Sequence, residues 1–249
     1  MALALMGLAG WFWREHSRSM RLADRRVSFV NQVSHELKTP LTNVRMYAEL
    51  LEEELWDAPE KPKRYLEILT AESQRLSRLI TNILTFARDG RSQLRIRPTV
   101  NVVDRIIGDV LKEIEPSLSA AGIEARVVAQ AAEPRLVDGD ALRQILFNLL
   151  SNVEKYAAGG KTVNISSALN GSLVTVRVTD NGPGIPAREQ ERVFEPFHRL
   201  NNTHDEGVSG TGIGLSIART LARLHGGDIW VSSADPGATF TVTLHTESP

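Results

Sequence analysis

The spacing of apolar residues predicts two long helices in the first third of the chain. From Arg14 to about Leu55 the pattern is helical, and apolar side chains recur in steps of three and four, as on one face of an amphipathic helix. These side chains are Val30, Val33, Leu37, Leu41, Val44, Tyr47 and Leu51. A second helical pattern extends from Lys63 to about Arg88, and the prolines of Asp57–Pro62 interrupt the chain between the two. Because a short turn joins the helices, we expect an antiparallel hairpin.

One hairpin cannot bury both of its apolar stripes, so the pattern predicts association with a second hairpin. Two such hairpins form a four-helix bundle, which makes a homodimer the expected state. Asp89–Ser92 contains Gly90, and glycine is the residue that most often ends a helix. We therefore expect the second helix to end there, and the segment to serve as a hinge.

Beyond this hinge the pattern changes to a mixture of shorter helices and strands. The predicted helices are Val102–Ala121, Asp140–Ala157 and Gly212–His225. The predicted strands are Ile123–Val128, Arg135–Val137, Val163–Ile165, Leu173–Val178, Ile229–Val231 and Thr239–Leu244. Asn170-Gly171 is typical of a tight hairpin turn between two of them. Helices mixed with largely antiparallel strands indicate an α+β two-layer sandwich.

Composition excludes several classes of site. The chain has 249 residues, enough for one large domain or two modest ones, and a net charge of -1. This balance gives no indication of nucleic acid as a partner, and we expect none. The absence of cysteine excludes disulfides, thiolate metal sites and cysteine nucleophiles.

The first segment departs from the average composition. Met1–Trp13 is wholly apolar, and several arginines follow within the next residues. An aromatic group followed by arginines is typical of the cytoplasmic end of a membrane helix. The segment is shorter than the roughly 20 residues needed to span a bilayer, and it lacks the leading positive charges of a signal peptide. We expect residues 1–13 to be the end of a membrane helix or an anchor, and 14–26 a basic juxtamembrane helix; a buried helix start is the alternative.

His35 is the first candidate for chemistry. It lies off the apolar stripe of its helix and should face solvent, with Glu36 beside it and Thr39 one turn further on. Imidazole is a neutral nucleophile near pH 7, and an adjacent carboxylate can take its ring proton. A His-Glu pair alone is usually an ordinary solvated surface pair.

Three further stretches have the chemistry of a nucleotide site. Asn148, Asn152 and Lys155 share one helix face, where carboxamide oxygens suit Mg²⁺ and an ammonium group suits phosphate. Asp180 follows a strand and precedes glycines that permit close approach of a flat ligand, and its carboxylate can accept a hydrogen bond from an amino group. Gly210–Leu215 leads into a helix, whose first backbone N–H groups attract phosphate. Separately, these stretches also read as a polar helix face, a turn and a glycine loop.

The order of the motifs resembles that of the histidine protein kinases of two-component signalling, over nearly everything from Val27 to Leu244. The matching stretches are the H-box, N-box, first glycine box, phenylalanine box and second glycine box of that family, at Ser34–Leu41, Gln144–Tyr156, Asp180–Pro186, Val193–Leu200 and Gly210–Leu215. The resemblance implies a dimerisation and histidine phosphotransfer domain at 27–90. It implies a catalytic ATP-binding domain of the Bergerat (GHKL) fold at 94–249.

The resemblance also implies residue roles. His35 would accept the γ-phosphoryl group of ATP and pass it to an aspartate of a response-regulator receiver domain, with Glu36 as general base. Thr39 matches the position that orients water for dephosphorylation of the partner, and Asn152 matches the Mg²⁺ ligand. Arg199–Gly210 would be the mobile lid over ATP. The positions that match nucleotide contacts are Asn148, Asn152, Lys155, Tyr156, Asp180 (adenine amino group), Gly182, Gly184, Arg199, Gly210, Thr211, Gly212, Gly214 and Leu215.

Two departures from the family pattern leave alternatives open. Glu154 stands where the family more often has an apolar or basic residue, and the lid lacks a cationic residue often found before its glycines. Both would lower a kinase rate, so a predominantly phosphatase protein or a weak kinase is one alternative. An ATP-driven conformational machine like the gyrase and chaperone relatives is another, and a non-catalytic dimeric scaffold is a third. The resemblance places the catalytic core in the cytoplasm, attached to the inner membrane through the N-terminus.

Overall fold

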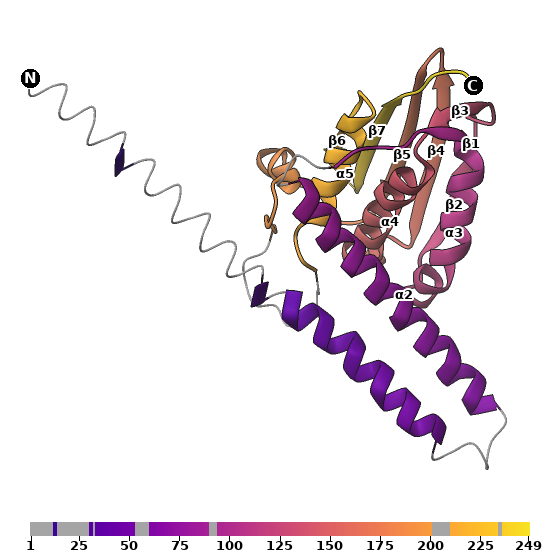
Figure 1. Ribbon diagram of the computed structural model, residues 1–249, viewed down its shortest axis with the longest axis vertical. Helices are drawn as coiled ribbons and strands as arrows, with labels where there is room; N and C mark the ends of the chain where they lie inside the picture. The colour runs from indigo at the N-terminus through magenta and orange to yellow at the C-terminus, as the bar shows by residue number, and fades with distance from the viewer. Residues whose placement is uncertain are drawn as a thin grey trace, which may run out of the picture. The chain divides into compact units, whose positions relative to one another are not determined.

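The computed structural model describes residues 12–13, 30–31, 33–52, 60–89, 94–200, 210–233 and 236–249 (Figure 1). The chain divides into two compact units, Met1–Ile80 and Thr81–Pro249. The boundary falls within α2 (Glu60–Asp89), so the last turns of this helix belong to the second unit.

The first unit contains the predicted helical hairpin. Residues 33–52 form one helix, which continues through Pro40, and α2 forms the other. Asn43 donates to Glu72 Oε1 at 2.8 Å, and the rings of Tyr47 and Tyr65 lie 5.5 Å apart. Tyr47 comes after Asn43 in the first helix, but its partner Tyr65 comes before Glu72 in α2. The two helices are therefore antiparallel, which confirms the prediction.

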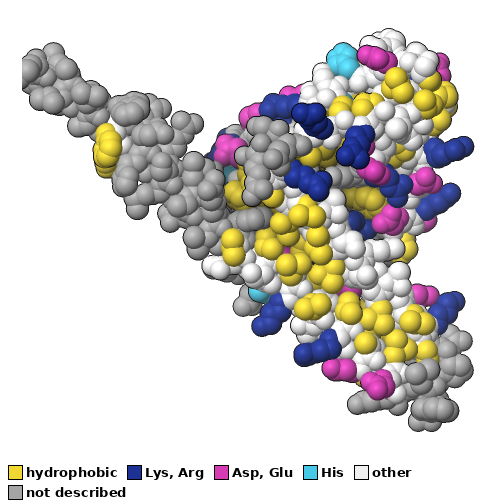
Figure 2. All heavy atoms as spheres, in the orientation of Figure 1, with side chains coloured by type: hydrophobic (Ala, Val, Ile, Leu, Met, Phe, Trp, Pro, Cys, Tyr) yellow, Lys and Arg dark blue, Asp and Glu magenta, His cyan; other side chains and the backbone are white. Residues whose placement is uncertain are grey.

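A single hairpin leaves much of its apolar surface exposed. Val30 and Leu41 are 60% and 61% exposed, and Leu66 and Ile80 on α2 are 56% and 48% exposed. Apolar side chains gather on the visible face of the hairpin (Figure 2). This exposed surface is what a second hairpin would cover.

The second unit is a two-layer α/β sandwich. Its five-stranded sheet has the order β2-β4-β5-β7-β6, in which β2 and β4 are parallel and the other neighbours antiparallel. These strands are β2 (Glu124–Val128), β4 (Thr162–Asn170), β5 (Leu173–Asp180), β6 (Asp228–Ser233) and β7 (Ala238–His245). The helices α3 (Val103–Ala120), α4 (Gly139–Tyr156) and α5 (Gly214–Leu224) lie on one face of the sheet (Figure 1). Short 3₁₀ turns occur at η1 (Ala158–Gly160), η2 (Ala187–Glu189) and η3 (Arg192–Phe194).

A small second sheet was not predicted. β1 (Thr99–Val102) pairs antiparallel with β3 (Pro134–Val137), next to the start of α4. In this second unit the predicted helices and the other predicted strands are all present, with ends that differ by a few residues. We expected largely antiparallel strands, and the sheet is antiparallel except where β2 pairs with β4 in parallel.

The alternation of buried and more exposed residues along β5 positions Asp180, a predicted nucleotide contact. Val174, Val176 and Val178 are fully buried beneath the helices, and the residues between them are more exposed. Continuing this alternation brings Asp180, at the end of the strand, onto the same buried face. The hairpin before β5 turns at Gly171, whose φ of 61° is the conformation that such a turn requires.

Several predictions fall on residues outside the described part of the chain. These concern almost all of the N-terminal segment 1–26, residues 57–59 of the predicted turn, the hinge after Asp89 and the lid between Leu200 and Gly210. The rest of the predicted turn is helical instead, because α2 begins at Glu60 and a proline in the first turn of a helix lacks only an N–H that has no helical partner there. No helix among the described residues has the length and apolar character that crossing a membrane demands.

Candidate nucleotide and phosphoacceptor sites

His35 lies exposed on the first helix of the hairpin, as predicted. Thr39, one turn further on, is also exposed, and its hydroxyl donates to the His35 carbonyl oxygen at 3.4 Å. Glu36 is only 7% exposed. The imidazole is therefore open to an incoming group, and the neighbouring carboxylate is held against the hairpin.

The α4 helix presents the predicted N-box face because its opposite side is fully buried. Asp138 caps the helix by accepting from the Ala141 N–H at 3.0 Å. Leu142, Ile145 and Leu149 have no exposed surface and fix the rotation of the helix. The polar face carries the predicted residues, of which Asn148 is buried, Asn152 and Lys155 are half-buried and Tyr156 is exposed.

The second glycine box follows this face of α4. A Cβ added at Gly214 would lie 3.2 Å from Asn148 Oδ1. A Cβ added at Gly210 would lie 3.6 Å from Lys155 Nζ and 4.0 Å from the Tyr156 hydroxyl. The structure thus brings together two predicted motifs that are far apart in the sequence, and Thr211, Gly212 and Leu215 follow on the same loop.

Asp180 has one engaged and one open carboxylate oxygen. The side chain is 6% exposed, and Oδ1 accepts from the N–H groups of Gly182 at 2.8 Å and Ala238 at 3.3 Å. In the described part of the chain, all hydrogen bonds to this carboxylate are accepted by Oδ1. Oδ2 is therefore available as an acceptor. Gly182 is tightly enclosed, since an added Cβ would lie 2.8 Å from the Ala157 Cβ. A planar group with an amino donor fits such a site.

The phenylalanine box forms the base of the predicted lid. Phe197 has a φ of 66°, a conformation uncommon for a residue with a side chain, and its N–H donates to the Gly212 carbonyl at 2.8 Å. His198 Nε2 lies 2.8 Å from Glu189 Oε2, and this hydrogen bond lowers the pKa of Glu189. Arg199 follows, half-buried. The two ends of the lid are therefore held together by a backbone bond.

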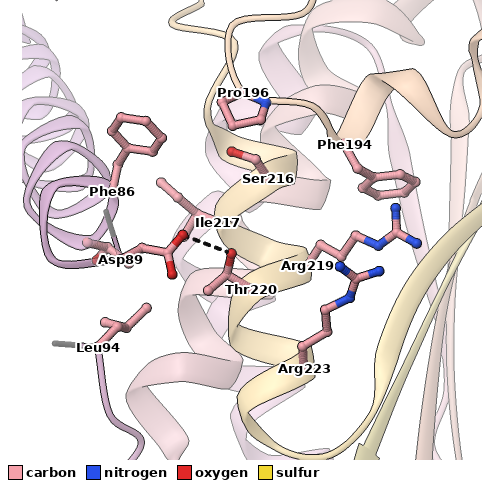
Figure 3. Close-up of a pocket in the computed structure, with 11 residues that line it drawn as sticks. Phe86, Asp89, Leu94, Phe194, Pro196, Ser216, Ile217, Arg219, Thr220 and Arg223 are labelled. Carbon is pink, nitrogen blue, oxygen red and sulfur yellow. Dashed lines mark hydrogen bonds between the residues drawn. The ribbon is translucent and has the colours of Figure 1, made fainter. Parts of the chain in front are cut away.

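A cavity of about 120 Å³ lies beside the phenylalanine box but is separate from the predicted nucleotide residues (Figure 3). Its walls come from the end of α2, Leu94, the phenylalanine box and α5, and none of the predicted nucleotide contacts lines it. In its wall the Thr220 hydroxyl donates to Asp89 Oδ2 at 3.4 Å (Figure 3). Phe86 of the cavity wall packs edge-on against Phe197, with 5.2 Å between the ring centres, and the predicted nucleotide residues lie elsewhere.

An ion cluster fixes α5 to the sheet. Asp228 accepts from Arg219 Nε at 2.9 Å and from Arg223 Nε at 3.1 Å, and Arg219 also pairs with Glu191. Burial acts to raise the pKa of Asp228, but the hydrogen bonds from the two arginines hold it well below its usual range. The Arg219 guanidinium also lies 5.0 Å from the centre of the Phe194 ring, which joins the cluster to the phenylalanine box.

Contacts of the last turns of α2 with α4 were missed at the sequence level. Asn82 Nδ2 donates to Asn148 Oδ1 at 2.9 Å, and Gln144 Nε2 donates to Asn82 Oδ1 at 3.0 Å. Gln144 also bonds Thr85 at 3.1 Å. A polar residue on a helix is by itself ordinary, so the pattern contains no signal for these contacts.

Comparison with known proteins identifies the family. Residues 25–91 match the His Kinase A (phospho-acceptor) domain, and residues 137–248 match the histidine kinase-, DNA gyrase B- and HSP90-like ATPases. The chain belongs to the histidine kinases of two-component systems. The sensor histidine kinase WalK of Bacillus subtilis is 33% identical over 228 residues, which are 90% of this chain and 37% of that protein. This histidine kinase chain thus spans little more than a third of the length of that relative.

Solved structures share the architecture of this histidine kinase. Full-length ShkA in complex with AMPPNP matches with a TM-score of 0.62 and 26% identity, over 89% of this chain and 46% of that one. The Acinetobacter baumannii histidine kinase AdeS matches with a TM-score of 0.59 and 23% identity, over 85% of this chain and 97% of that one, a likeness in fold.

The donors present suit magnesium and a nucleotide. Among the residues that the structure describes, no group of three or more His, Cys, Asp or Glu side chains could hold a metal ion. Asn148 and Asn152 offer neutral oxygens instead, which suit Mg²⁺ when phosphates supply further ligands. The open Oδ2 of Asp180 suits the amino group of adenine.

Proposed function

We propose that this chain is an ATP-dependent histidine autokinase that phosphorylates His35 and passes the phosphoryl group to an aspartate of a response regulator. The observation that carries the proposal is the near-buried Asp180 with its open Oδ2, in a chain that also exposes His35 on a helical hairpin. Residues 27–90 would form the phosphotransfer domain and 94–249 the catalytic domain.

The reaction consists of two phosphoryl transfers. In the first, a ring nitrogen of His35 forms a bond to the γ-phosphorus of ATP, the bond from that phosphorus to the bridging oxygen breaks, and ADP leaves. The ring proton passes to the Glu36 carboxylate. In the second, a carboxylate oxygen of the regulator's aspartate forms a bond to the phosphorus, the bond from phosphorus to the ring nitrogen breaks, and His35 takes its proton back from Glu36. Such transfers depend mainly on placement and on stabilisation of charge.

The nucleotide would be held by the residues that the second unit brings together. Asp180 Oδ2 would accept from the adenine amino group, and Lys155 and the N–H groups of the second glycine box would face the phosphates. Asn152, supported by Asn148, would hold Mg²⁺, which neutralises phosphate charge when bound. Full-length ShkA, solved with AMPPNP, supports a nucleotide in a domain of this fold.

The partners follow from surface and family. The exposed apolar residues of the hairpin support a homodimer through a four-helix bundle. The apolar segment before Trp13 and the arginines after it support attachment to the inner membrane with the catalytic core in the cytoplasm.

The test is transfer of γ-labelled phosphate from Mg-ATP to the purified chain. We expect label that is stable to alkali and labile to acid, abolished by His35→Gln and strongly reduced by Asn152→Ala. His245→Gln and Asn164→Ala are matched controls, because both residues are exposed on the second unit and belong to no motif. Label that survives His35→Gln, or an unlabelled chain that binds Mg-ATP, would refute the autokinase.

Phosphatase activity toward the regulator is a second candidate. The exposed Thr39 hydroxyl, one turn from His35, is placed to orient a water. Thr39→Ala should slow dephosphorylation of the regulator at least tenfold while phosphorylation of His35 continues, within the range typical of a general acid-base or positioning group. Equal loss of both activities would argue for a structural role of Thr39.

A further inference from the structure

Asn82 makes the best-formed polar contact between the end of α2 and the proposed nucleotide helix. Its bonds to Asn148 and Gln144 measure 2.9 and 3.0 Å, and the bond from Gln144 to Thr85, which also joins α2 to α4, measures 3.1 Å. Of the hydrogen bonds that join these two helices in the described part of the chain, the one from Asn82 is the one that reaches Asn148.

The amide of Asn82 is oriented by its two neighbours. Gln144 Nε2 donates to Asn82 Oδ1, so this oxygen must face Gln144. The Nδ2 group then points at Asn148 Oδ1. In this arrangement Asn82 acts toward Asn148 as a donor.

In this arrangement Asn148 is withheld from a ligand. The side chain is 7% exposed and its oxygen is taken by Asn82, on the side where Gly214 of the second glycine box lies closest. Its Nδ2 group is buried and has no hydrogen-bond partner in the part of the chain that the structure describes. A buried donor without a partner is unfavourable, so a ligand that re-orients this amide and supplies a partner gains free energy.

We propose that Asn82 holds Asn148 in a closed arrangement, and that Mg-nucleotide binding competes with this contact for the Asn148 carboxamide. The proposal rests on the proposed function, because it assumes that Asn148 contacts the nucleotide. Binding of nucleotide then loosens the last turns of α2 from α4. Docking of the α2 end in turn lowers nucleotide affinity by the same factor.

The first measurement is the affinity of the whole chain for Mg²⁺ with the β,γ-imido analogue of ATP, by calorimetry. Asn82→Ala should tighten binding about three- to tenfold, the range that loss of one neutral hydrogen bond gives. Thr70→Ala is the matched control, because the Thr70 hydroxyl bonds only its own helix, at the Leu66 carbonyl. A substitution that merely damages the fold would weaken binding, so the sign of the change separates the two effects.

The second measurement needs no variant. Adding the same Mg-nucleotide to the unaltered chain should speed amide hydrogen exchange in residues 82–89. Unchanged or weaker affinity in Asn82→Ala, or unchanged or slower exchange in residues 82–89, would overturn the competition. An unaltered chain that binds no Mg-nucleotide would instead refute the proposed function itself.

Discussion

Asp180→Asn isolates the role of one oxygen atom. Both N–H groups that reach Oδ1, from Gly182 and Ala238, are donors, so an asparagine must keep its oxygen there. Its amide nitrogen is then forced into the place of Oδ2. The substitution leaves the internal bonds of the site intact and changes the outward atom from an acceptor to a donor.

The magnitude follows from the bond that is lost. A hydrogen bond to a charged group contributes about 1.5–3 kcal/mol, so Mg-ADP should bind about tenfold to a hundredfold more weakly. Guanine carries an oxygen where adenine carries the amino group. The new donor should therefore make the variant bind Mg-GDP more tightly than the unaltered chain does. Calorimetric titration of both nucleotides measures the ratio directly.

Asp140→Asn is the matched control for charge, since Asp140 is exposed on the first turn of α4. It should change neither affinity. An Asp180→Asn chain whose affinity for Mg-ADP falls less than twofold, or whose preference between the two nucleotides stays the same, would refute the assignment of Oδ2 to the base.

Three further predictions concern stability. Asp138→Ala removes the N-cap of α4 and should lower the free energy of unfolding by about 1–2 kcal/mol in urea, while Asp140→Ala changes it little. Gly182→Ala places a Cβ 2.8 Å from that of Ala157 and should lower the unfolding free energy by about 1–3 kcal/mol and the melting temperature with it. The pKa of Asp228 is lowered by folding, so its contribution is present above about pH 4 and is lost as the pH falls below that. Asp228→Asn should therefore flatten the stability profile below about pH 4.

Each of these has a contrary outcome. Equal effects of the two α4 substitutions would show that charge near the helix start matters more than the cap. A Gly182→Ala chain as stable as the original would mean that the loop shifts to admit the methyl group. An unchanged acid profile in Asp228→Asn would assign the acid loss to other carboxylates.

Local pattern was enough to predict the elements that carry most of the chemistry. The apolar stripe predicted that His35 faces solvent, because residues off the stripe of an amphipathic helix are exposed. The polar positions of α4 were predicted to share a face, and the buried Leu142, Ile145 and Leu149 produce that arrangement. The turn at Gly171 and the register of β4 with β5 also follow from local sequence.

Features that depend on distant pairing could not be predicted in this way. β1 has four residues, too few for a period to appear, and its partner β3 lies beyond α3. The parallel pairing of β2 with β4 is likewise set by the packing of the helices between them. The bond from Asn82 to Asn148 joins residues 66 positions apart, and helical periodicity says only which face each residue occupies.

The size of the Asn82 contact limits what it can control. One neutral hydrogen bond changes an equilibrium by about tenfold at most, so docking of the α2 end can tune nucleotide affinity but cannot switch it off. His35 belongs to the first compact unit and the proposed nucleotide residues to the second, and α2 is the 30-residue helix that runs through both. A larger change in kinase activity must therefore come from whether His35 can reach the γ-phosphate. Two quantities describe His35 phosphorylation: its maximal rate and the nucleotide concentration that gives half of that rate. Asn82→Ala should therefore change the half-maximal concentration by a larger factor than the maximal rate.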